Sequence, residues 1–213
     1  MATVLLVHGF ASKGGRGSTD KLRPYFEREG YRVYELDYTR TFLPTYTRSN
    51  KKLAMSWVGW ARAMRDLQKD LTGETHLIGL GHSNGSPILR LSSWLGAPFT
   101  QLVFMNPALN TKGKKTRVGP TVKRVHVWHA RSDYVVRFAS YIPWHPWGKM
   151  GAVGYKGKDP RYVNYDQESE EFGGKKLRHG KVFSDKWLEV FGPMVVRKVT
   201  ESLDSTPTKT LGV

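Results

Sequence analysis

Short apolar runs alternate along the chain with stretches of helical periodicity. Several of these runs are continuously apolar, which is typical of strands covered on both faces. A repeated strand, helix, strand order predicts a doubly wound α/β fold, with helices on both sides of a mostly parallel sheet. The six expected strands cover residues 4–7, 33–36, 76–80, 101–105, 125–128 and 162–165.

Two longer helices are predicted from apolar residues that recur at steps of three and four. The second should start after Ser184 as N-cap and kink near Gly192 and Pro193. The apolar positions of the first are Leu53, Trp57, Trp60, Met64, Leu67 and Leu71. Those of the second are Trp187, Phe191, Val195, Val199 and Leu203.

The length of 213 residues predicts a single domain over residues 1–203. Residues 204–213 are too poor in apolar side chains to order themselves, so we expect a disordered C-terminal tail. No window approaches the ~18 apolar residues of a membrane span, and no basic segment precedes the first apolar run. We therefore expect a cytoplasmic protein without a transmembrane segment.

Composition excludes some chemistry. The absence of cysteine rules out a disulfide framework, a thiolate metal site and a cysteine nucleophile. The sequence has no phosphate-binding loop, no helical histidine pair with a glutamate and no calcium loop, so we expect no metal and no cofactor. The chain has 34 Lys and Arg against 18 Asp and Glu, a net charge of +16, which favours anionic partners.

Residues 81–85 read Gly-His-Ser-Asn-Gly between an expected strand and an apolar helical pattern. This context is typical of a nucleophile elbow, in which Ser83 sits on a strained turn that Gly81 and Gly85 make possible. The backbone N–H of Asn84, at the start of the helix, is a candidate oxyanion donor. The same short pattern also occurs by chance in glycine-rich surface loops.

Two motifs carry a family resemblance. Residues 4–10, Val-Leu-Leu-Val-His-Gly-Phe, resemble the first core strand and oxyanion turn of the α/β-hydrolase superfamily, and residues 81–85 resemble its elbow. The resemblance spans residue 3 to about residue 200 and does not fix a substrate. It implies that Phe10 gives a second oxyanion N–H and that His8 supports the loop. Only about eighteen residues separate Pro107 from the next expected strand, which implies a compact, lidless member.

A serine nucleophile needs a histidine base and a carboxylate, which in this fold follow it in the order acid, then histidine. Asp133 lies just after the expected strand 125–128 and is the candidate acid, although it could also cap a helix; Asp166 is the substitute. His179, in a His-Gly turn before the last helix, is the candidate base. His145 competes with it.

Basic residues cluster in two segments that we expect near the site. Their charge favours an anionic substrate or surface, while a solvated lysine face is the simpler reading; nucleic-acid binding would lack specificity. Candidate substrate-binding residues are His82, Trp144 and Trp147, although both tryptophans could instead pack over the sheet. The basic residues are Lys112, Lys114, Lys115, Arg117, Lys123 and Arg124 in the connection 108–124, and Lys175, Lys176, Arg178 and Lys181 beside His179.

The sequence thus predicts a serine hydrolase of the carboxylesterase, lipase or thioesterase kind, acting on a small-molecule or lipid acyl ester through an acyl-enzyme. Acyl transfer or amide cleavage would use the same residues. A third alternative is a non-catalytic scaffold that binds a polyanion or a protein through its basic face.

Overall fold

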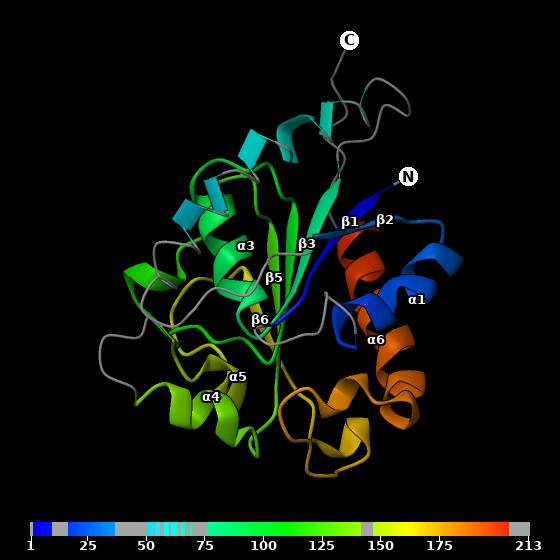
Figure 1. Cartoon of the computed structure of the whole chain (residues 1–213), viewed down its shortest axis with the longest axis vertical. Coiled ribbons are helices and arrows are strands. Elements are labelled where there is room, and N and C mark those ends of the chain that lie inside the picture. The colour runs from blue at the N-terminus through cyan, green and yellow to red at the C-terminus, as the bar shows by residue number, and fades with distance from the viewer. Residues whose placement is uncertain are drawn as a thin grey trace.

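Six parallel strands form one sheet in the order β2-β1-β3-β4-β5-β6 (Figure 1). The computed structural model describes residues 2–9, 17–36, 76–141 and 147–204, with part of 51–69. Every expected strand is present, and no end differs from its prediction by more than two residues. The strands are β1 (Thr3–Val7), β2 (Arg32–Leu36), β3 (Leu77–His82), β4 (Gln101–Met105), β5 (Arg124–His129) and β6 (Tyr162–Asp166).

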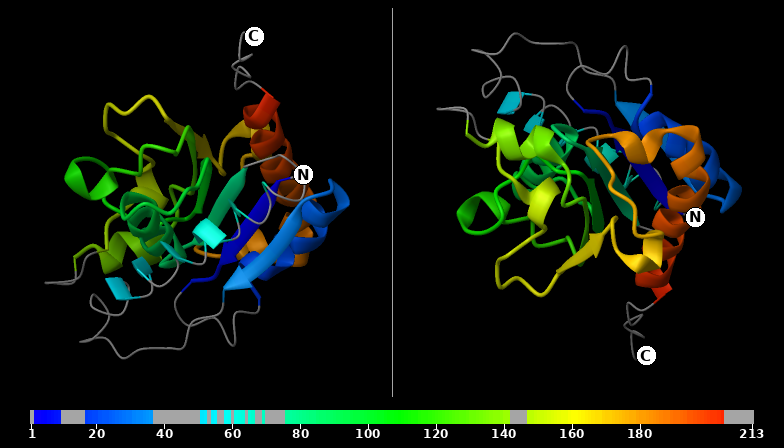
Figure 2. Two further views of the ribbon diagram at one scale, coloured as in Figure 1. Left: turned by 90° about the horizontal axis from the view of Figure 1, so that it is seen from above. Right: turned by 90° about the horizontal axis from the view of Figure 1, so that it is seen from below.

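Helices cover both faces of the sheet, which confirms the doubly wound prediction (Figures 1 and 2). On one face lie α1 (Arg23–Arg28) and α6 (Asp185–Asp204), and on the other lies α3 (Gly85–Trp94). The short helices are η1 (Thr19–Leu22), η3 (Lys114–Thr116), α4 (Tyr134–Ala139), α5 (Met150–Val153), η4 (Glu170–Phe172) and η5 (Lys181–Phe183).

The core has two layers because side chains alternate across a strand. In β1, Val4 and Leu6 pack toward the face of α1 and α6, whereas Leu5 and Val7 pack toward α3. All four side chains are buried, so β1 is central and covered on both sides. This explains the continuous apolar run in the sequence.

The last helix, α6, runs from Asp185 to Asp204 with Pro193 inside it. Ser184 precedes it as expected, and its hydroxyl donates to the carbonyl of Lys181 at 2.9 Å. At Gly192 a Cβ atom would lie 2.8 Å from the ring of Tyr25, so the glycine lets α1 and α6 approach closely. The apolar positions expected in the helix 53–71 and the tail 205–213 lie outside the described residues.

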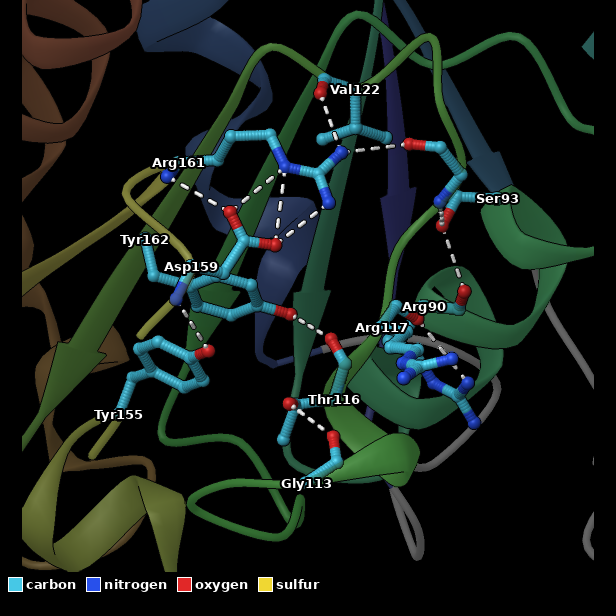
Figure 3. Close-up of polar contacts among 11 residues, drawn as sticks. Arg90, Ser93, Gly113, Thr116, Arg117, Val122, Tyr155, Asp159, Arg161 and Tyr162 are labelled. Carbon is cyan, nitrogen blue, oxygen red and sulfur yellow. Dashed lines mark hydrogen bonds and ion pairs between the residues drawn. The ribbon is translucent and has the colours of Figure 1, made fainter. Parts of the chain in front are cut away.

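The connection from β4 to β5 is fixed along the α3 side of the sheet (Figure 3). The Tyr162 hydroxyl donates to the carbonyl of Thr116, and Arg161, paired with Asp159, donates to the carbonyl of Val122 at 3.1 Å. The connection therefore runs from the carboxyl ends of the strands to their amino ends and is held by hydrogen bonds from Tyr162 and Arg161.

This course corrects one expectation about charge. We expected all six basic residues of the connection 108–124 to face the site at the carboxyl ends of the strands. However, β5 begins at Arg124, so both Lys123 and Arg124 lie at the amino ends of the strands, opposite to the elbow. Only the first part of the connection is near the elbow.

Within the described part of the chain, no helix has the length and apolarity needed to cross a bilayer.

Candidate active site

Ser83 lies on a sharp turn between the end of β3 and the start of α3. Its φ of +50° is in the left-handed region, which is uncommon for a residue other than glycine. The turn is fixed by two backbone hydrogen bonds: Ser83 N–H donates to the carbonyl of Met105 at 3.0 Å, and Ala108 N–H donates to the carbonyl of Ser83 at 3.1 Å. The strained backbone that the motif predicts at Ser83 is thus present, held by the last residue of β4 and by the chain that follows it.

The glycines of the motif are needed for close approach. A Cβ on Gly85 would lie 2.3 Å from the carbonyl oxygen of Val7, and one on Gly81 would lie 2.7 Å from the carbonyl carbon of Gly85. Both are shorter than any normal contact. The elbow therefore packs on the end of β1 with no room for a side chain.

Asp133 is fully buried and caps α4. Its Oδ1 accepts from the Val136 N–H at 3.2 Å, so the cap considered from the sequence is present. Its Oδ2 accepts from the Asn106 amide at 3.0 Å and from His179 Nδ1 at 2.8 Å. The residue can cap the helix with one oxygen and hold a histidine with the other.

His179 is brought to Asp133 from 46 residues further along the chain. With Nδ1 directed at the carboxylate, Nε2 is the nitrogen available to accept a proton. Within the described residues, Ser83 and His179 share no hydrogen bond; such bonds often tighten only in the complex with substrate.

His82 is buried between the elbow and His179, the candidate base. Its ring centroid lies 4.8 Å from that of His179 and 4.9 Å from that of Phe183, and neither ring nitrogen has a hydrogen-bond partner among the described residues. Burial, with smaller contributions from His179 and His8, lowers the pKa of His82 well below its ordinary value. His82 stays a candidate substrate contact, and its buried ring also packs against the ring of His179.

Asn106, Gln167 and Glu168 were not anticipated from the sequence. Asn106, at φ +46°, donates to Asp133 and accepts from the Gln167 amide at 3.1 Å. Glu168 accepts from Ser132 N–H at 3.1 Å and from Leu177 N–H at 2.7 Å. It therefore joins the segment that contains Asp133 to the segment that contains His179. Asn106 had a usable signal: it directly follows β4, the neighbour of the strand that carries the elbow.

The remaining candidates fall into two groups. Asp166, the substitute acid, pairs with Arg131 at 2.9 Å and not with His179. Trp147 lies at the elbow, where its indole N–H donates to the side-chain oxygen of Asn84 at 3.4 Å. Phe10, Trp144 and His145 lie outside the described residues.

Among the residues that the structure describes, no group of three or more His, Asp or Glu side chains could hold a metal ion. The arrangement assembled here is a serine on a strained turn, beside a carboxylate–histidine pair.

The sheet order, the elbow and the helices on both faces define the α/β-hydrolase fold. Solved structures with this fold resemble the chain at low identity. The esterase Pf2001 from Pyrococcus furiosus matches with a TM-score of 0.56 and 14% identity, over 95% of this chain and 82% of that one. Alpha/beta hydrolase domain-containing protein 10 from mouse matches with a TM-score of 0.54 and 11% identity, over 96% and 90%.

Est1E from Butyrivibrio proteoclasticus, in a structure with bound ferulic acid, matches with a TM-score of 0.54 and 15% identity, over 96% of this chain and 90% of that one. No known family profile and no curated protein matches the sequence. At these identities the likeness shows the fold alone.

Proposed function

We propose that the protein is a serine hydrolase that cleaves a carboxylic ester or thioester through a covalent acyl-enzyme. The observation that carries this proposal is the 2.8 Å contact between His179 Nδ1 and the buried carboxylate of Asp133. The fold brings these two residues together although they lie far apart in the sequence. A buried carboxylate directed at one ring nitrogen leaves the other basic. Ser83 follows β3 and Asp133 follows β5, at the same end of the parallel sheet with β4 between them.

In the first half-reaction, Ser83 Oγ attacks the acyl carbonyl while His179 Nε2 takes the hydroxyl proton. Asp133 accepts from Nδ1–H throughout, fixes the tautomer and stabilises the imidazolium. His179 then gives the proton to the departing alkoxide or thiolate, and the C–O or C–S bond breaks. Water, deprotonated by the same histidine, attacks the acyl-enzyme and releases the acid and the free serine.

The negative charge on the carbonyl oxygen needs donors at the elbow. The backbone N–H of Asn84 lies at the start of α3, where the helix dipole favours an anion. By resemblance, the N–H of Phe10 is the second donor.

His82 contributes through its neutrality. The imidazolium of His179 forms 4.8 Å, centroid to centroid, from a ring whose pKa burial keeps low, so no second positive charge opposes proton uptake by the base. The ring supports His179 at little electrostatic cost.

The direct test is labelling by a fluorophosphonate together with hydrolysis of p-nitrophenyl esters of increasing acyl length. We expect Ser83→Ala to abolish labelling and both Ser83→Ala and His179→Ala to lower turnover by up to about 10⁶-fold, since the residues act as a unit. Matched controls are Ser202→Ala, at the far end of α6, and His76→Ala, at the amino end of β3, which should keep wild-type rates.

Two outcomes would redirect the proposal. Turnover that rises with an added alcohol or amine acceptor, or cleavage of p-nitroanilides, would favour acyl transfer or amide cleavage on the same triad. A folded wild type that neither labels nor turns over any ester would overturn the hydrolase proposal. Binding of a polyanion that weakens steeply with salt would then identify the basic face as the functional surface.

A further inference from the structure

The segment 134–141, which contains α4, exposes large apolar side chains to solvent. Of the nine exposed large apolar residues among those described, four lie here: Tyr134 and Val135 at 45%, Phe138 at 70% and Tyr141 at 73%. Val136 alone is buried from this helix, against Ala108 and Ala152. A surface helix normally turns its apolar side inward, so this outward concentration calls for a partner.

We call these four exposed side chains the apolar rim, and it borders the candidate active site. The helix begins directly after Asp133, its N-cap, and Tyr134 packs under the Arg178 guanidinium at 5.7 Å from the ring centroid. Arg178 is the neighbour of His179. In Figure 1, α4 lies at the lower end of the molecule, where the strands β1 and β3 end.

The surroundings of the rim are cationic. Three carboxylates are engaged: Asp133 is buried, Asp166 pairs with Arg131, and Glu168 accepts from the backbone of Ser132. Glu170 and Glu171 are exposed and offset part of the positive charge of Lys175 and Lys176. Arg137, on α4 itself, donates to the carbonyl of Arg131 at 3.0 Å. Exposed Lys and Arg residues lie on the segment 131–137 and on the segment 175–181, which are in contact through Tyr134 and Arg178. They are Arg131, Arg137, Lys175, Lys176, Arg178 and Lys181.

We propose that the apolar rim and its basic surround dock on an anionic lipid surface, so that the acyl substrate of Ser83 is an ester carried by a membrane lipid. Aromatic side chains that enter the headgroup region and flanking Lys and Arg that bind anionic lipids are the two components of interfacial binding. A second copy of the chain fits less well, because +16 proteins would bring like charges face to face. The inference rests on the proposed function for the substrate, but not for the binding.

Co-sedimentation with vesicles tests the docking. With Ser83→Ala, which cannot consume the lipid, we expect binding to phosphatidylcholine vesicles that contain phosphatidylserine, and weak binding to phosphatidylcholine alone. Phe138→Ser should lower the partition coefficient by about tenfold or more, because a buried aromatic side chain is lost from the contact. Arg137→Gln should weaken binding to anionic vesicles only, and added salt should do the same.

The matched control is Trp94→Ser. Trp94 is 49% exposed at the carboxyl end of α3, away from the elbow, so its loss should leave vesicle binding unchanged. Equal effects of Phe138→Ser and Trp94→Ser would overturn the proposal, as would equal binding to neutral and anionic vesicles. A dimer in light scattering that Phe138→Ser dissociates would assign the rim to a second copy.

The two proposals can fail separately. Absence of vesicle binding in a protein that reacts with fluorophosphonate would remove the lipid surface and leave the hydrolase. Binding to anionic vesicles by a wild type that does not label would remove the hydrolase and leave the docking surface. If both hold, Phe138→Ser should lower hydrolysis of an ester embedded in vesicles while its rate on soluble p-nitrophenyl butyrate stays at the wild-type value.

Discussion

Asp133 accepts more hydrogen bonds than a helix cap requires. Its two oxygens take the Val136 N–H, the Asn106 amide and His179 Nδ1, and the carboxylate is closed off from solvent. The Asn106 amide is itself held by Gln167. The orientation of Asp133 is therefore determined by side chains that follow β4 and β6, as well as by its own helix.

The role of Asn106 can be tested with two substitutions that separate its side chain from its backbone. Asn106→Gly and Asn106→Ala both remove the amide that holds Asp133, so both should lower kcat/KM by about tenfold. At φ +46° an alanine is strained and a glycine is not, so the alanine variant should also lose about 1 kcal/mol more of unfolding free energy. Full activity in the glycine variant would contradict an orienting role for the amide.

At the scale of elements, the elbow depends on a strand that it does not belong to. Gly85 opens α3 in contact with the carbonyl of Val7, the last residue of β1. The turn between β3 and α3 is thus shaped by the pairing of β1 with β3.

Gly85→Ala should therefore destabilise the fold and silence the site together. The added Cβ would lie 2.3 Å from a backbone oxygen that cannot swing away, and we expect a loss of at least about 2 kcal/mol in denaturant unfolding. Gly59→Ala is the control, because a Cβ at this helical position meets no atom of the described residues within 4 Å; it should stabilise by about 0.5–1 kcal/mol. A wild-type midpoint for Gly85→Ala would show that the contact can relax.

The strands and the elbow could be predicted from the sequence because burial and close backbone approach restrict which residue types can occupy them. The central strands β1, β3, β4 and β5 are buried on both faces and read as continuous apolar runs. The edge strands β2 and β6 are partly exposed and were found from shorter apolar runs, and the elbow was found from its glycines. The short helices α4 and α5 were not predicted as elements because six and four residues carry too little periodicity. The amides of Asn106 and Gln167 and the carboxylate of Glu168 were missed because their roles depend on which strands are neighbours.

Across the whole molecule, several histidines are buried in the neutral form. His126 bonds Tyr165 and Gln101 at 3.1 Å each, and burial lowers its pKa from 6.5 to about 3. The pKa values of His82 and His129 are lowered for the same main reason. These groups take up protons more readily in the unfolded chain, so folding stability is present above pH 6.5 and is lost as the pH falls.

We expect acid destabilisation that His126→Gln reduces. Between pH 7 and pH 5 an unfolded histidine protonates while buried His126 does not, which costs about 2 kcal/mol of unfolding free energy. The variant should lose about that much less than wild type over the same range, measured by denaturant unfolding at both pH values. The comparison uses the change with pH, so any difference between the proteins at pH 7 does not affect it. Equal losses would show that His126 is protonated in the folded state.

The contact of Gly85 with β1 has a consequence for how the protein is made. Val7 pairs with Gly81 across more than seventy residues, so β1 leaves the ribosome long before the strand that completes its pairing. The contact between Gly85 and Val7 that packs the elbow on β1 forms only after that pairing, and His179 is synthesised later still. Under the proposed mechanism, a nascent chain therefore carries no reactive serine, and hydrolysis begins only when nearly the whole domain has been translated and packed.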